Sequence, residues 1–173
     1  EKERLWTLLV ENMRPENREY RYNFLYDNCT TRARDRIEEA VEGKIIYPEQ
    51  DTVRTYREII HQYTAQHPWA ELGNDICLGA EADRPISVRD EMFAPFYLLR
   101  YANGAVIQGS DGSTRPLVLS QSKVVEGRDV EIQKEFPWSP ALSVWILFFC
   151  VAGLTVVERW RHACSVSYTH LTL

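Results

Sequence analysis

The residues most able to do chemistry lie in one run, Tyr26–Asp35, where a cysteine directly follows Asp27 and Asn28. Asn and Asp are strong helix N-caps, so Cys29 is expected in the first turn of a helix. There the thiol faces unpaired backbone N–H groups and the positive end of the helix dipole, which both favour the nucleophilic thiolate. Cys29 is therefore a candidate catalytic nucleophile.

The residues around the cysteine have a capping interpretation and a functional one. Besides capping the helix, Asp27 and Asn28 could orient the loop, and a backbone N–H near Cys29 could form an oxyanion hole. Arg32 and Arg34 follow within two turns and could bind a phosphate or carboxylate of a substrate. Arginines on a helix are also commonly solvated or paired with acidic residues of the same helix, so both interpretations stay open.

A cysteine nucleophile needs a general base, usually a histidine held by a third group. His61 is expected near the polar edge of a helix, His67 in a loop, His162 beyond an apolar stretch and His170 in the tail. None is a convincing partner, so we expect the base upstream of Glu1. The sequence also contains no metal-ligand cluster and no Gly-rich phosphate cradle, so we expect no metal and no other cofactor.

Composition sets the broad class of the protein. With 173 residues and 45% hydrophobic content, the chain is long enough for one packed domain. Its net charge of -5 gives no reason to expect nucleic acid as a partner. Cys29 and Cys77 could form a disulfide in an extracytoplasmic chain, but that bond would remove the nucleophile.

The elements that position Cys29 are mainly helical. Apolar periodicity predicts helices over 1–13, over 29–42, and from Asp51 or Thr52 to 65. A period of two over 20–26 predicts a short strand or extended segment before the cysteine.

The second half of the chain mixes loops, a helix and short strands. Pro68, Gly73 and Gly79 indicate a loop. Ser87 and Asp90 form a capping box before a helix that ends at Gly104, with Pro95 as a kink or a start. Short strands are predicted over 105–107, 116–119 and 124–130, with a turn over 109–113.

A 19-residue run without charge, Ser139–Val157, follows this domain. As a helix it is about 28 Å long, close to the roughly 30 Å of a hydrocarbon core. Trp138 and Trp160 flank it at interfacial positions. We predict a domain over 1–136 and a transmembrane helix with interfacial flanks over 137–161. The last residues, 165–173, resemble a translated sequencing-adapter tail and carry no information about fold or function.

Three runs of residues occur together in a known family: Tyr22–Asp35 with its Asp-Asn-Cys-Thr-Thr-Arg string, the stretch from Trp69 through Gly73, Asp75 and Gly79 to Pro85, and Glu91–Pro95. They resemble the periplasmic domain of Lnb-type lipoprotein N-acyltransferases. The resemblance implies an α+β fold, the C-terminal part of a circularly permuted papain-like (NlpC-like) domain. In this chain that part is mainly helical, with a few short strands, and one transmembrane helix follows it.

The resemblance also implies a reaction, in which an acyl chain moves from a membrane phospholipid to the α-amino group of a lipoprotein's N-terminal cysteine. Cys29 would carry the acyl group as a thioester, without a cofactor. The family places residues 1–136 in the periplasm at the bacterial inner membrane, with the phospholipid donor and the lipoprotein acceptor as partners. Its catalytic histidine precedes the cysteine, so the base is expected upstream of Glu1 and the 173 residues alone are expected to be inactive.

Two other functions fit the same residues. One is a cell-wall cysteine peptidase or amidase of NlpC-like type, in which water instead of an amine resolves the acyl-enzyme. The other is a non-catalytic, membrane-anchored module in which Cys29 is structural. A histidine upstream, in a strand context, would favour either enzyme over the module.

Overall fold

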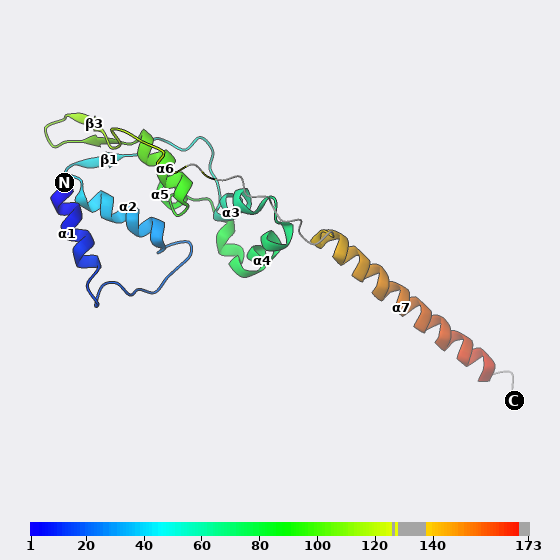
Figure 1. The fold of residues 1–173 in the computed structure, drawn as a ribbon. Helices are drawn as coiled ribbons and strands as arrows, with labels where there is room; N and C mark the ends of the chain where they lie inside the picture. Colours follow the sequence, from blue (N-terminus) through cyan, green and yellow to red (C-terminus); the bar gives the residue numbers. More distant parts are fainter. Residues whose placement is uncertain (126, 128–137, 170–173) are drawn as a thin grey trace. The chain divides into compact units, whose positions relative to one another are not determined.

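A computed structural model of the chain describes residues 1–125, 127 and 138–169 (Figure 1). The chain divides into two compact units. The first comprises Glu1–Tyr63 and Leu78–Asp129, and the second comprises Thr64–Cys77 and Val130–Leu173.

The first unit combines helices with a small antiparallel sheet. Its helical elements are α1 (Lys2–Asn12), α2 (Cys29–Ala40), α3 (Tyr56–Thr64, without its last residue), the 3-10 helix η1 (Ala80–Asp83), α5 (Val88–Glu91) and α6 (Pro95–Gly104). Its strands are β1 (Lys44–Ile46), β2 (Val106–Gln108) and β3 (Thr114–Pro116), in the order β1-β2-β3. Both pairs are antiparallel, with Ile107 opposite Ile45 on one side and Arg115 on the other.

Tyr56 lies at the centre of the hydrophobic core of this unit. Its ring contacts those of Phe93, at 5.1 Å between centroids, and Tyr26, at 5.7 Å, both edge to face. The core thereby joins the segment before α2 to α3 and to the turn after α5. The buried side chains of this cluster are Leu25, Tyr56, Ile59, Ile60, Ala82, Ile86, Met92, Phe93, Ala94, Tyr97 and Tyr101.

A buried carboxylate lies inside the same core. Glu91 is fully buried and accepts hydrogen bonds from the Tyr101 hydroxyl and, at 3.3 Å, from Arg54. Desolvation by burial, together with this hydrogen bond, raises the pKa of Tyr101 above its ordinary value. The bond to Tyr101 links α5 to α6, and the bond to Arg54 links α5 to the segment before α3.

The second unit contains α4 (Pro68–Leu78, without its last residue) and α7 (Pro140–Thr169). The indole N–H of Trp69 donates to the carbonyl oxygen of Trp138 at 2.8 Å. Within α7, the stretch Pro140–His162 begins with a long apolar run and has no buried residue, so it is long and apolar enough to cross a membrane.

Several sequence predictions are confirmed. The fold is mixed and mainly helical, as predicted. The predicted helices over 1–13 and 29–42 correspond to α1 and α2, and the predicted helix that ends at Gly104 corresponds to α6. The long apolar helix follows near its predicted position. The Ser87–Asp90 capping box is present, and α6 begins at Pro95. The turn over 109–113 joins β2 to β3, where the Gly109 amide donates to the Ser113 carbonyl at 2.8 Å.

Three predictions are wrong. The segment 20–26 is no strand, because the Asn23 side chain accepts hydrogen bonds from the Leu25 and Tyr26 amides and closes a turn. The predicted loop around Gly73 is the helix α4, since Pro68 occupies its first turn, where a missing N–H costs nothing. The helix α3 begins at Tyr56, and neither Asp51 nor Thr52 caps it.

The strand predictions are partly correct. The strand β2 matches the predicted 105–107 to within one residue, whereas β3 lies at 114–116, before most of the predicted 116–119. No pattern in the sequence predicts β1. Of the predicted strand 124–130, residues 124 and 125 are not in a strand, and all the others except 127 lie outside the described residues. In the predicted tail, residues 165–169 continue α7, and 170–173 lie outside the described residues.

Candidate functional site

Cys29 is the first residue of α2, as the sequence predicts, and its side chain is exposed. The N-cap is Asn28, whose backbone is extended (φ -115°, ψ 179°). Its side-chain oxygen accepts from the backbone amides of Thr30 and Thr31, at 2.8 and 2.9 Å. The thiol therefore stands at a capped helix N-terminus.

Asn28 also ties this loop to the core. Its side-chain amide donates to the carbonyl oxygens of Phe24, at 2.9 Å, and Phe93, at 3.0 Å. Its own backbone N–H donates to the Thr31 hydroxyl, at 2.9 Å. The side chain is only 4% exposed, and both of its polar groups are used twice. Asn28 thus fixes the backbone that leads into Cys29 and positions α2 against the turn after α5.

Asp27 and Arg32 form a bidentate ion pair across the first turn of α2. The carboxylate accepts from Arg32 Nε at 2.7 Å and from its Nη2 at 2.9 Å. These hydrogen bonds and the positive charge lower the pKa of Asp27 below its ordinary value. The guanidinium carbon also lies 3.5 Å from the centroid of the Tyr20 ring, a cation–π contact.

Arg34 lies on the other side of α2 and is buried. Its guanidinium donates to Asp35, at 2.7 and 2.9 Å, and to the carbonyl oxygen of Arg89, at 2.8 Å. Arg89 in turn pairs with Asp35 and Glu38, so that a group of charges joins α2 to α5. Both predicted arginines therefore have partners within the protein, and the binding of a substrate anion by either stays a prediction.

Arg32 remains open to a ligand, because its side chain is about one third exposed. It lines a pocket of about 450 Å³ together with Tyr20 and Arg36. Four glutamates share that lining: Glu11, Glu16, Glu19 and Glu39. The pocket thus borders α2 at Arg32, which is three residues after Cys29 in the chain.

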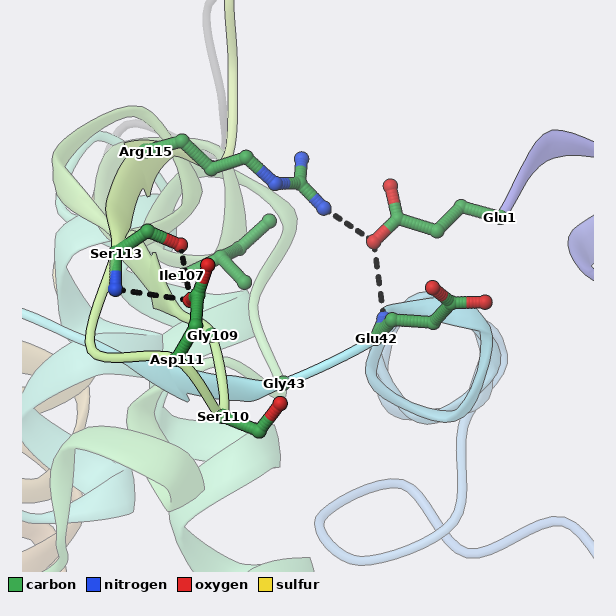
Figure 2. A pocket seen from close by; sticks show the side chains of 9 residues that line it. All are labelled: Glu1, Glu42, Gly43, Ile107, Gly109, Ser110, Asp111, Ser113 and Arg115. Carbon is green, nitrogen blue, oxygen red and sulfur yellow. Dashed lines mark hydrogen bonds and ion pairs between the residues drawn. The ribbon is translucent and has the colours of Figure 1, made fainter.

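A larger pocket, of about 650 Å³, lies between α1, the end of α2 and the β2–β3 hairpin (Figure 2). The Glu1 carboxylate accepts from the Glu42 backbone N–H at 2.9 Å and from Arg115. Across the pocket, Asp111 accepts from the Ser113 hydroxyl at 2.6 Å and from its amide at 3.0 Å. These bonds anchor the hairpin turn and the start of α1, and Cys29 does not line the pocket.

Among the residues that the structure describes, no group of three or more His, Cys, Asp or Glu side chains is placed to hold a metal ion. His61 lies on α3 and His67 directly precedes α4. The expected base upstream of Glu1 lies outside the sequence, and it stays a prediction. His170 lies outside the described residues.

Comparison with known sequence families identifies the segment that carries the site. The first 62 residues match the family described as the Lnb N-terminal periplasmic domain. Over these residues the chain is similar to that family. The match contains α1, the capped loop, Cys29 and all of α2. No curated protein and no solved structure matches the chain.

The site was predictable from the sequence in part. Cys29, its N-cap and the start of α2 are where the sequence predicts them. Two parts of the site were not predicted. Thr31 completes the capping box, and the Phe93 carbonyl accepts a hydrogen bond from the N-cap side chain. Thr31 departs from the usual Glu or Gln at that position, and a backbone carbonyl has no signature in sequence.

Proposed function

We propose that this chain is part of a membrane-bound lipoprotein N-acyltransferase with Cys29 as its nucleophile. The supporting observation is an exposed thiol on the first residue of α2, at a rigidly capped helix N-terminus within the Lnb-matched segment. The apolar helix α7 supports a location in a membrane, where both a phospholipid and a lipoprotein reside. The papain-like fold and the periplasmic side of residues 1–136 belong to the same proposal.

The proposed reaction has two acyl transfers. In the first, the Cys29 thiolate attacks an ester carbonyl of a phospholipid, the C–O bond breaks, and the leaving alkoxide takes a proton from the base that earlier received the thiol proton. The products are a Cys29 thioester and a lysophospholipid. In the second, the α-amino group of the lipoprotein attacks the thioester, the thiolate leaves, and the base removes the proton of the amine.

Backbone amides at the start of α2 suit the negative charge that develops on each tetrahedral intermediate. The Thr30 and Thr31 amides already donate to the Asn28 side chain. These two bonds do not use the backbone amide of Cys29, which is next to the thiol and is the one that would bind the oxyanion. In this scheme Asn28 does not touch the substrate. It is a positioning residue that holds the backbone of Cys29 in place.

The test uses cells that lack the full-length gene to which this sequence belongs and that are complemented with full-length variants. Mass spectrometry of lipoprotein N-termini should show free α-amines without the gene and N-acylated cysteine with the wild type. Cys29→Ser should fail to restore N-acylation, whereas Cys77→Ser, which changes another exposed cysteine, should restore it. Full N-acylation in the deleted strain would refute the acyltransferase.

A second measurement separates acyl transfer from hydrolysis. Protein purified from the complemented cells and supplied with a phospholipid bearing an alkyne-tagged acyl chain should acquire a label that hydroxylamine removes, as a thioester requires. The label should be absent from Cys29→Ser. A chain that instead cleaves cell-wall peptides and takes up no label would be a peptidase or amidase.

A further inference from the structure

The helix α4 has an inverted distribution of side chains. On a helical wheel Leu72, Ile76, Trp69, Gly73, Cys77 and Ala70 occupy one continuous arc of about 160°. Each of these apolar or small residues is exposed, with Ile76 at 75% and Trp69 and Leu72 at 37%. The polar residues of the other arc, Glu71, Asn74 and Asp75, are only partly exposed.

A helix on the surface of a soluble domain shows the opposite arrangement, with its polar face toward water. In α4 the polar arc is the less exposed one, and Glu71 on that arc accepts a hydrogen bond from the Thr64 hydroxyl at 3.3 Å. A continuous exposed apolar arc indicates an apolar partner.

The position of α4 in the chain's second unit indicates that this partner is lipid. The indole N–H of Trp69, on the apolar arc, donates to the carbonyl of Trp138, two residues before the apolar helix α7 begins at Pro140. Through Trp69, the arc is therefore bonded to the residue that lies just before the proposed membrane span. Tryptophan is enriched at that level of a membrane.

We propose that α4 is an interfacial helix that lies on the lipid bilayer, with Trp69, Leu72 and Ile76 in the region between headgroups and acyl chains. The inference rests on the proposed membrane span of α7. The helix has no Lys or Arg and carries two acidic residues on its other arc, so apolar contact holds it to the membrane and attraction to anionic headgroups does not.

The experiment places the full chain in lipid nanodiscs with a fluorescent NBD probe on Cys77, which is exposed on the apolar arc. Cys29→Ser, Cys150→Ala and Cys164→Ser leave Cys77 as the single labelling site. In the matched control the label moves to the polar arc, by Cys77→Ser with Asn74→Cys. Lipids brominated near the headgroup end of the acyl chains report lipid contact, and iodide reports water contact.

We expect bromolipids to quench the probe on Cys77 strongly and iodide to quench it weakly, with the reverse order on the polar arc. The pattern should be the same in zwitterionic and in anionic discs. Leu72→Ser with Ile76→Ser should abolish the lipid contact, whereas Leu119→Ser, at a highly exposed leucine outside α4, should leave it intact. Equal iodide quenching at both positions without bromolipid quenching would overturn the proposal.

Two further measurements distinguish lipid from a second protein chain and test the span of α7. Protection of Cys77 that appears only when a disc holds two copies would assign the arc to a second chain and overturn the lipid proposal. Bromines deep in the bilayer should quench the part of the tryptophan emission that Trp145→Phe removes. Loss of that signal would refute the span of α7 itself, separately from any result at Cys77.

Discussion

Replacing Asn28 by alanine tests whether this residue holds the cysteine in place. The substitution removes the acceptor for the Thr30 and Thr31 amides and both donors to the carbonyls of Phe24 and Phe93. Cys29 itself is unchanged. The variant therefore separates the framework of the site from its chemistry.

The magnitude follows from the partners that are lost. Removing a helix N-cap costs about 1 kcal/mol. A buried carbonyl left without its donor, as at Phe93, costs about 1–3 kcal/mol more. A total of about 2–4 kcal/mol would speed amide exchange in α2 by about 30- to 700-fold, since every 1.4 kcal/mol is tenfold.

The assay is hydrogen exchange of the α2 amides from Ala33 to Ile37, which Asn28 does not touch, in the full chain in nanodiscs. Asn17→Ala is the matched control, because Asn17 is exposed and its side chain donates a single hydrogen bond, at 3.1 Å, to the Glu11 carbonyl. We expect little change in the control, as for most surface substitutions. If Asn28→Ala exchanges no faster than Asn17→Ala, Asn28 does not hold the site.

Two other substitutions test the surroundings. Asp27→Asn should cost about 0.5 kcal/mol at neutral pH, as expected for a partly exposed pair. Arg32 lowers the pKa of Asp27 in the folded protein. The ion pair's contribution to the free energy of unfolding is therefore complete above the ordinary carboxyl pKa and is lost as the pH falls through the lowered pKa of the folded state. Denaturation curves of the variant and the wild type should thus converge in acid. Gly43→Ala should destabilise the sheet, because φ is +118° and a Cβ would lie 2.5 Å from the Gln108 carbonyl oxygen. Gly112→Ala, at φ +81° with nothing within 4 Å, should cost less by thermal unfolding; equal costs would show that the contact is unimportant.

The capped cysteine was predictable because its signals are local. A strong N-cap residue and an apolar spacing specify the start of α2 within a few positions of Cys29. The site's long-range support was not predictable in this way, since it depends on a backbone carbonyl at Phe93. Any residue type could supply that carbonyl.

The errors arose where one residue type serves two purposes. Asn23 alternates with aromatic residues as a strand would, but its side chain bonds to the backbone two and three residues later and closes a turn. Pro68 and Gly73 are typical of loops. However, proline is well suited to a helix's first turn, and a glycine inside a helix costs only about 1 kcal/mol.

The hydrogen bond between Asn28 and Phe93 has a consequence for biosynthesis. Its partners are 65 residues apart in the sequence, so the ribosome must add that many residues before the loop can be fixed. At about 5–20 residues per second this takes about 3–13 s. During that interval the thiol of Cys29 is carried on an unfinished chain, and its local environment is completed only after the family-matched segment has been made.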